Sequence, residues 1–177
     1  MGIASAPPVT EKSRVDFRGR LLALDALHAW RDEVRASGRR LVATNGCFDL
    51  LHLGHVTYLE AARNLGDLLL VGVNGDASVR ALKGAGRPVN SEQDRALVLA
   101  ALESVSAVCV FPEMEALSFL RVARPDIYAK GGDYQHKTLP ERPAVEAYGG
   151  QVILIDLVPE RSTSALIARV RALPGAS

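Results

Sequence analysis

His52 and His55 stand in the run His52-Leu53-Gly54-His55, a few residues after Asn45-Gly46-Cys47-Phe48. Gly46 lets the backbone approach a ligand closely, and Gly54 marks the entry to a helix. The unpaired amides and the dipole of a helix N-terminus attract a phosphate group. Two imidazoles that flank such a point can bind the same anion. The spacing therefore predicts a phosphate site between a strand and a helix.

Two further groups of residues have the chemistry to bind anions. Lys83 carries a long cationic arm in the glycine-flanked run Leu82-Lys83-Gly84-Ala85-Gly86, and a solvated surface lysine is the alternative interpretation. The run Ser162-Thr163-Ser164 precedes the last predicted helix. Its hydroxyls and amides can cap that helix, bind phosphate, or do both.

Other uses of the histidine pair have less support from the surrounding residues. The two rings can pack locally or cap the helix. A zinc site needs third and fourth ligands, and the remaining candidates stand at no recognised zinc spacing. They are Cys47, Cys109, His28 and His136. We assign no metal ligand, and the sequence has no G-x-G-x-x-G fingerprint, P-loop or G-x-S-x-G elbow.

The elements that must position these residues follow from apolar patterning. Apolar runs predict strands at residues 41–44, 68–73, 107–111, 127–130 and 151–157. Helical spacing predicts helices at residues 56–65, 77–82, 92–102, 113–122 and 164–173. Ser91 is a candidate cap for the third of these helices.

The strands read as continuous apolar runs and alternate with helices, which is typical of a parallel sheet covered on both faces. The prediction is a doubly wound α/β fold. Ligands of such folds bind beyond the carboxyl ends of the strands. The loops of interest therefore follow Thr44, Val73, Lys130 and Val158.

The first 38 residues carry no visible chemistry. Residues 1–18 contain prolines and scattered charges without apolar periodicity, which predicts a loosely held tail. From Leu21 onward, apolar residues recur at helical spacing as far as a stop at Ser37-Gly38. They are Leu24, Leu27, Trp30 and Val34. We expect an N-terminal tail and helix over residues 1–38, packed on the main domain over residues 39–173.

Composition excludes several broad classes of protein. The chain has 177 residues, 48% of them hydrophobic, which suffices for one buried core. Lys and Arg number 21 against 20 Asp and Glu, so no overall field favours nucleic acid or a membrane surface. The two cysteines suggest no disulfide framework, and no targeting or membrane-spanning segment is evident. We expect a cytoplasmic protein with no nucleic-acid or membrane partner.

The histidine run, together with Asn45-Gly46-Cys47-Phe48-Asp49, resembles the opening motif of the H-x-G-H cytidylyltransferase-like nucleotidyltransferases. Further motifs resemble one branch, the D-glycero-β-D-manno-heptose 1-phosphate adenylyltransferase (ADP-heptose synthase) family. They are Asn74-Gly75-Asp76-Ala77-Ser78, Leu82-Lys83-Gly84, Arg87-Pro88-Val89-Asn90, Lys130-Gly131-Gly132-Asp133-Tyr134 and Arg161-Ser162-Thr163-Ser164. The resemblance covers residues 22–172 or so, with the motifs in the order of the family, and implies a Rossmann-like nucleotidyltransferase fold.

The resemblance implies transfer of AMP from ATP to D-glycero-β-D-manno-heptose 1-phosphate, giving ADP-heptose and pyrophosphate for lipopolysaccharide core synthesis. It assigns catalysis to His52, His55 and Lys83. It assigns nucleotide binding to Asn45, Gly46, Cys47, Phe48, Gly54, Arg95, Ser162, Thr163 and Ser164. It assigns the acceptor side to Asp49, Lys130 and Asp133. For Arg95, salt bridges on the helix surface are the alternative. For Asp49, we favour a structural role in holding its loop over direct contact.

The resemblance also implies a cofactor and partners. Mg²⁺ is expected to arrive bound to ATP, because few carboxylates in the motifs could form a protein site. A homodimer is expected. The family is often fused to a sugar kinase, and nothing in the N-terminal segment resembles one, so a separate heptose kinase and a separate phosphatase are expected in the pathway.

The sequence departs from the family pattern at three positions, with Gly75, Ser106 and Glu160 where Ser, Asp and Gly are usual. Of these, only Glu160 adjoins the serine-rich turn, where a carboxylate would repel triphosphate unless it points away.

Two other functions stay open. A cytidylyltransferase acting on glycerol 3-phosphate or a similar alcohol phosphate would share the fold and the histidine motif, since base selection in this fold rests largely on backbone contacts. A regulatory module that binds nucleotide without catalysis would release no pyrophosphate with any acceptor. The presence of His52, His55 and Lys83 argues against the regulatory module.

Overall fold

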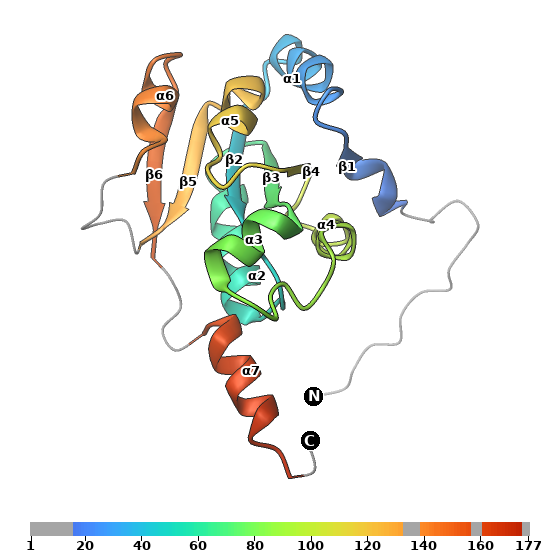
Figure 1. Ribbon diagram of the computed structural model, residues 1–177. Coiled ribbons are helices and arrows are strands. Elements are labelled where there is room, and N and C mark those ends of the chain that lie inside the picture. The colour runs from blue at the N-terminus through green and yellow to red at the C-terminus, as the bar shows by residue number, and fades with distance from the viewer. Residues whose placement is uncertain (1–15, 133–138, 157–160, 175–177) are drawn as a thin grey trace, which may run out of the picture.

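The computed structural model describes residues 16–132, 139–156 and 161–174 and contains one parallel sheet with helices on both faces (Figure 1). Six strands lie in the order β1-β4-β3-β2-β5-β6, and every neighbouring pair is parallel. They are β1 (Leu21–Leu22), β2 (Leu41–Gly46), β3 (Leu68–Asn74), β4 (Ala107–Phe111), β5 (Ile127–Gly131) and β6 (Gln151–Ile155). All carboxyl ends therefore lie at one edge of the sheet.

Helices connect and flank the strands. They are α1 (Leu27–Ala36), α2 (Leu53–Arg63), α3 (Asp76–Lys83), α4 (Glu92–Ala100), α5 (Leu117–Ala123), α6 (Arg142–Glu146) and α7 (Thr163–Arg171). Side-chain caps begin two of them. Ser91 Oγ accepts a hydrogen bond from the Asp94 amide at 3.2 Å, as predicted, and Ser162 Oγ accepts one from the Ala165 amide at 3.1 Å. Each cap satisfies an amide that the helix itself leaves unpaired.

Successive residues of the central strands pack into opposite faces of the sheet. Val42 joins a buried cluster with Leu59 of α2 and with residues of α4, whereas Ala43 joins a second cluster with Leu27 of α1 and Phe119 of α5. Burial of one such large apolar side chain contributes about 1.5–3 kcal/mol to folding. Each face thus has its own core, and the predicted doubly wound α/β fold is confirmed.

The order of the strands creates a switch point at the paired strands β2 and β5. From β2 the chain steps to β3 and β4 on one side, and it then crosses the sheet to β5 and β6 on the other side. The loops that leave β2 and β5 therefore diverge, and this switch point is where open α/β sheets bind ligands. Gly46 ends β2 at this point, so the predicted histidine loop begins there.

The N-terminal segment differs from its prediction. Leu21–Leu22 does not begin a helix but forms β1, which pairs with β4, and the helix starts only at Leu27. The Arg20 guanidinium donates hydrogen bonds at 2.8–3.2 Å to three backbone carbonyls at and beyond the end of α4. These tertiary hydrogen bonds hold the segment along the sheet edge and override its helical periodicity.

Other boundaries shift by a few residues. α2 starts at Leu53 rather than at residue 56, and its first turn includes Gly54, where a Cβ would lie 3.0 Å from that of Arg161. α5 starts at Leu117 rather than at residue 113, and the short α6 was not predicted. β6 ends at Ile155, and residue 157 of the predicted strand lies outside the described residues.

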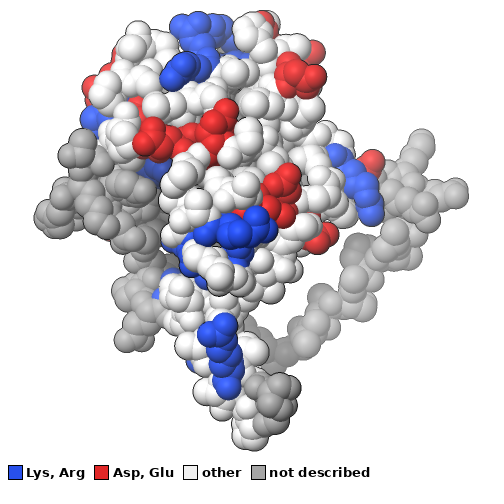
Figure 2. Space-filling view, in the orientation of Figure 1, with Lys and Arg blue, Asp and Glu red and all other residues white. Residues whose placement is uncertain are grey.

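Both signs of charge occur on the visible face. Basic and acidic side chains are interspersed in Figure 2, with basic groups at the top of the view, over α3 and over α7. The last turn of α3 carries Arg80 and Lys83, and that of α7 carries Arg169 and Arg171. Within the described ranges, no helix has the length and apolar character needed to cross a bilayer.

Candidate active site

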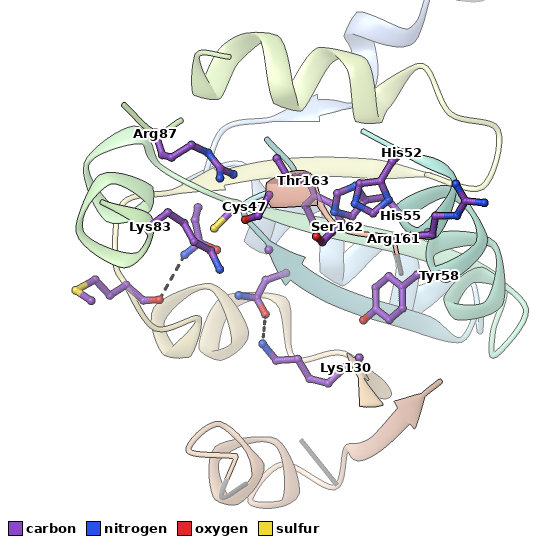
Figure 3. Close-up of a pocket in the computed structure, with 18 of the residues that line it drawn as sticks. Cys47, His52, His55, Tyr58, Lys83, Arg87, Lys130, Arg161, Ser162 and Thr163 are labelled. Atoms are coloured by element: carbon purple, nitrogen blue, oxygen red, sulfur yellow. Dashed lines mark hydrogen bonds between the residues drawn. The ribbon is translucent and has the colours of Figure 1, made fainter. Parts of the chain in front are cut away.

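A cavity of about 570 Å³ opens at the carboxyl edge of the sheet, beyond the ends of β2 and β5 (Figure 3). Its walls come from the loop after β2, the first turns of α2 and α7, and the ends of α3 and β5. The sequence-predicted residues that line it are Asn45, Gly46, Cys47, Phe48, His52, Gly54, His55, Lys83, Lys130, Ser162, Thr163 and Ser164. The fold therefore brings most of the predicted site together.

The two histidines form a stacked pair at the N-terminus of α2. His52 has an extended backbone (φ −142°, ψ 169°) just before the helix, and the His55 amide donates to its carbonyl at 2.9 Å. The ring centroids lie 3.9 Å apart, with the planes inclined by 24°. The Phe48 ring meets His55 edge-on, with centroids 5.4 Å apart. Both imidazoles thus line the cavity from a helix N-terminus.

Burial disfavours the charged form of both imidazoles. It lowers the pKa of His55 to about 4, and the charge of His52 adds to this effect. Burial also lowers the pKa of His52, and Arg161 lowers it further. Neither Nδ1 atom has a hydrogen-bond partner within residues 16–132, 139–156 and 161–174. A phosphate bound in the cavity would bring a negative charge that favours protonation of the rings.

Two glycines make the loop around the histidines compact. A Cβ atom at Gly46 would lie 3.0 Å from the Phe48 ring, and one at Gly54 would lie 3.0 Å from the Cβ of Arg161 and 3.1 Å from the His52 ring. Side chains at these positions would force the neighbouring groups to move. The glycines therefore allow the end of β2, the histidine pair and the segment before α7 to approach one another.

The wall near β5 carries a chain of polar contacts centred on Asn45. Its Oδ1 atom accepts hydrogen bonds from the Tyr128 hydroxyl at 2.5 Å and from Lys130 Nζ at 2.8 Å. Lys130 Nζ also lies 3.6 Å from Oε1 of Glu141. Burial lowers the pKa of the Lys130 ammonium, and the Glu141 carboxylate opposes that shift. Lys130 is therefore a buried cation fixed in position by its neighbours.

Lys83 lines the cavity from the last turn of α3. Gly84 (φ 91°) and Gly86 (φ 82°) follow it in left-handed conformations that glycine adopts most readily. The Lys83 side chain is exposed, in contrast to buried Lys130. An exposed ammonium at the rim of a cavity has the freedom to close on a bound anion. That role for Lys83 stays a prediction.

The serine-rich turn connects α7 to the histidine loop. Ser162 caps the helix, and the Thr163 hydroxyl donates to the Leu50 carbonyl at 3.3 Å. Both residues, with Ser164, line the cavity. Capping by Ser162 is confirmed. It satisfies one amide of the first turn, and a bound phosphate could accept hydrogen bonds from others.

Arg95 is buried and is not among the residues that line the cavity, so its predicted contact with the nucleotide stays a prediction. Its side chain is 0% exposed. The guanidinium donates to the carbonyls of Cys47, Asn74 and Asn90 and to the Asp76 carboxylate at 2.8 Å. A planar donor group with these four partners is committed to the protein. It ties the histidine loop to the end of β3 and the start of α4.

Asp49 likewise lies behind the cavity wall. Its carboxylate accepts hydrogen bonds from Arg87 Nε and from the amides of Val89 and Asn90, at 2.8 and 3.1 Å for the two amides. Burial disfavours ionisation of Asp49, but these hydrogen bonds outweigh burial and lower its pKa. The geometry agrees with a structural role that holds the loop after α3, rather than with direct acceptor contact.

Two of the remaining predicted positions, Asp133 and Glu160, lie outside the described residues. The cavity also has lining residues to which sequence reasoning assigned no role in the site. They include Tyr58, Arg87, Glu141 and Arg161. Arg87 and Arg161 belong to motifs already noted, so a signal was present. Glu141 precedes a short helix with no functional pattern, and only the fold brings it to the site.

This site, at the switch point of a parallel sheet, is characteristic of α/β nucleotidyltransferases. It combines a histidine pair at one helix N-terminus, hydroxyls at a second, and lysines on two further walls. The chain matches the cytidylyltransferase-like family over residues 43–170, a range that contains all of these groups. The chain belongs to this family.

Several relatives refine this assignment. The chain is 56% identical to the bifunctional protein HldE of Methylobacillus flagellatus over 147 residues, which are 83% of this chain and 30% of that protein. It is 51% identical to the bifunctional protein HldE of Alkalilimnicola ehrlichii over 174 residues, 98% of this chain and 36% of that protein. The chain thus spans about a third of the length of the curated relatives it matches.

Solved structures share the fold. A lipopolysaccharide core biosynthesis protein from Thermoplasma volcanium superposes with a TM-score of 0.57 at 28% identity, covering 68% of this chain and 98% of that one. The pantoate-beta-alanine ligase of Francisella tularensis superposes with a TM-score of 0.58 at 14% identity, covering 81% of this chain and 68% of that one. The ligase indicates a shared fold alone.

Proposed function

We propose that this chain transfers AMP from ATP to D-glycero-β-D-manno-heptose 1-phosphate, producing ADP-heptose and pyrophosphate. The observation that carries the proposal is the stacked pair of His52 and His55 at the N-terminus of α2, with Lys83 and Lys130 on other walls of the same cavity. The choice of heptose phosphate is supported by identities of about half the residues to bifunctional HldE proteins.

In the proposed reaction, an oxygen of the sugar phosphate attacks the α-phosphorus of ATP. A new P–O bond forms while the bond between the α-phosphorus and the bridging oxygen breaks, and pyrophosphate leaves with that oxygen. His52 and His55 donate hydrogen bonds to the oxygens on which charge develops. Because they are positioned before the reaction, their stabilisation of the transition state requires little reorganisation.

The remaining residues bind and align the two anions. The loop at Cys47 and Phe48 holds the α-phosphate through its backbone, and the Ser162–Ser164 turn binds the β- or γ-phosphate at the start of α7. Lys83 neutralises both reacting groups by closing from the cavity rim. Lys130 provides a fixed positive charge on the acceptor side. Each assignment is supported by the presence of that residue in the cavity lining.

Mg²⁺ is proposed to enter with ATP. Within the described parts of the chain, no group of three or more His, Cys, Asp or Glu side chains could hold a metal ion. This donor set fits an ion that is bound mainly by phosphate oxygens and water, as is usual for Mg²⁺ with nucleotides. When bound, the ion would neutralise triphosphate charge. We also propose a homodimer, and a heptose kinase activity and a phosphatase that act earlier in the same pathway.

The proposed function is tested by measuring pyrophosphate release with each of four nucleoside triphosphates, using heptose 1-phosphate and glycerol 3-phosphate as acceptors. We expect ATP with heptose 1-phosphate to give the fastest turnover, and mass analysis of the product to identify ADP-heptose. A strong preference for CTP would overturn the adenylyl assignment. Nucleotide binding without pyrophosphate release from any pair would instead indicate a regulatory module.

A further inference from the structure

One polar atom in the cavity wall has no role in the proposed phosphate chemistry. Glu141 lines the cavity and is only 6% exposed. Its Oε1 atom lies 3.6 Å from Lys130 Nζ. Its Oε2 atom is buried and has no hydrogen-bond partner among the residues that the structure describes. A buried carboxylate oxygen without a donor costs free energy, so folded proteins retain few of them.

The surroundings of Glu141 restrict what this oxygen can bind. A carboxylate repels a phosphate group, so the oxygen does not serve the triphosphate. A divalent cation needs several oxygen ligands, and the described residues offer no acidic cluster for one. The ligand group must therefore donate a hydrogen bond and must carry no negative charge. An uncharged O–H or N–H group does both.

The position of Glu141 is set by its neighbours. The ion pair with Lys130 holds one carboxylate oxygen, and Lys130 is itself held by its 2.8 Å hydrogen bond to Asn45 at the end of β2. The second oxygen is therefore oriented before a ligand arrives. A site built in this way discriminates against a ligand that lacks the donor, because the carboxylate would then stay unpaired.

We propose that Glu141 is a specificity-determining residue that accepts a hydrogen bond from an uncharged donor of a substrate. The donor is either a hydroxyl of the acceptor sugar or the exocyclic amino group of the nucleotide base, which present the same chemistry to a carboxylate oxygen. This inference rests on the proposed function, because it takes the cavity to be the transfer site.

The test compares E141A and E141Q with the wild type and with E146Q. Glu146 lies on α6, pairs with Arg142 at 3.4 Å and is exposed, so E146Q removes a nearby carboxylate that does not line the cavity. Calorimetry gives the Kd values for ATP and for inosine triphosphate, in which a carbonyl replaces the amino group. Pyrophosphate release gives the acceptor KM, and urea unfolding verifies that each variant is folded.

We expect E141A to weaken recognition of the donor about tenfold to hundredfold, the range for a hydrogen bond to a charged group. If the donor is the base, the Kd for ATP rises and the preference for ATP over inosine triphosphate disappears. If the donor is a sugar hydroxyl, the acceptor KM rises and both Kd values hold. E141Q, which keeps a carbonyl oxygen in the same volume, should lie between E141A and the wild type, and E146Q should match the wild type.

A folded E141A variant with both nucleotide Kd values and the acceptor KM within twofold of the wild type would overturn the inference. Failure of the proposed function gives a different result, because the wild type itself would then release no pyrophosphate with heptose 1-phosphate. In that case, the KM comparison uses whichever acceptor of the pyrophosphate-release assay gives the highest turnover, in place of heptose 1-phosphate. If none is active, the two nucleotide titrations alone decide the role of Glu141.

Discussion

Two partly buried imidazoles at one helix N-terminus set the electrostatics of the site at the scale of single residues. A neutral histidine donates a hydrogen bond without the cost of desolvating a permanent charge. His52 and His55 both have lowered pKa values, so they add little positive charge to a cavity that already contains two lysines. Positive charge on the two histidines then develops only when the anionic substrate binds, so it does not destabilise the free protein.

His55→Ala removes a donor that should interact more strongly with the transition state than with bound ATP. We expect turnover to fall by at least about a hundredfold, the lower end for loss of one preorganised donor. Single-turnover kinetics and an ATP titration measure the two effects separately. His28→Ala, at an exposed position paired with Asp32, is the matched control. A folded His55→Ala variant that loses less than tenfold would show that His55 is not catalytic.

The lowered pKa of His55 also predicts how stability depends on pH. The unfolded chain binds a proton at His55 below about pH 6.5, whereas the folded chain binds it only near pH 4. The free energy of unfolding is therefore unaffected by His55 above pH 6.5. As the pH falls toward 4, protonation of His55 in the unfolded chain lowers that free energy by at most about 3 kcal/mol. Urea unfolding between pH 7 and 4.5 should therefore show a steeper loss for the wild type than for His55→Asn. Parallel curves would contradict the shift.

Lys83→Ala should lower turnover more than it weakens ATP binding, because an exposed lysine can close on both phosphates as they react. Lys83→Arg should not restore full activity, since a planar guanidinium does not replace a compact ammonium between two crowded phosphates. Single-turnover rates and ATP titrations give the comparison, and Arg80→Ala on the preceding turn of α3 is the control. Unchanged single-turnover rates in Lys83→Ala would make Lys83 an ordinary solvated residue.

At the scale of elements, the site depends on loops that are fixed by hydrogen bonds from residues outside the cavity lining. Arg95 of α4 hydrogen-bonds to carbonyls in the histidine loop and at the end of β3, and Asp49 fixes the loop that follows α3. Neither residue lines the cavity, yet together they fix the distance between the histidine pair and Lys83.

Arg95→Ala should destabilise the fold by about 3 kcal/mol or more, because it leaves buried carbonyls and Asp76 without their donor. Arg95→Lys should recover only part of this loss, since one ammonium cannot reach all four partners. Urea unfolding provides the measurement, with exposed Arg121→Ala as the control. If Arg95→Lys retains full stability and instead weakens ATP binding, Arg95 contacts the nucleotide as the family resemblance implied.

At the scale of the whole molecule, the N-terminal segment is packed into the same structure as the site-bearing strands. β1 extends the sheet beside β4, and Leu27 and Val34 of α1 are buried in one of the two cores. The site lies farther along the sheet, at the ends of β2 and β5, and β4 and β3 separate it from β1. Stability and activity should therefore respond separately to changes in this segment.

Arg20→Ala tests that separation. The substitution removes donors to three carbonyls that anchor the sheet edge, and we expect a loss of about 1–3 kcal/mol in the free energy of unfolding with no change in the KM for ATP. Urea unfolding and steady-state kinetics measure the two quantities, and Arg18→Ala, at an exposed position two residues before Arg20, is the control. An altered KM would mean that the segment reaches the site.

The sequence by itself determined the elements and residues whose signals are local. The strand at residues 107–111 was predicted with the bounds of β4, because a run buried on both faces is apolar at every position. The histidine pair was predicted to flank a helix start for a similar reason, since both rings and the helix amides fall within one turn. Such patterns need no knowledge of distant residues.

Only the tertiary structure decided the contacts of Leu21, Arg95 and Glu141. The periodicity of Leu21 fits a helix, yet pairing with β4 makes it a strand. Arg95 in a helix reads equally as a ligand, a surface ion pair or a buried anchor, and its partners come from three separate segments. Glu141 meets Lys130 only because α6 follows β5 across the sheet edge. Hydrogen bonds between distant segments form only once the strands have been ordered, so a local sequence pattern does not specify them.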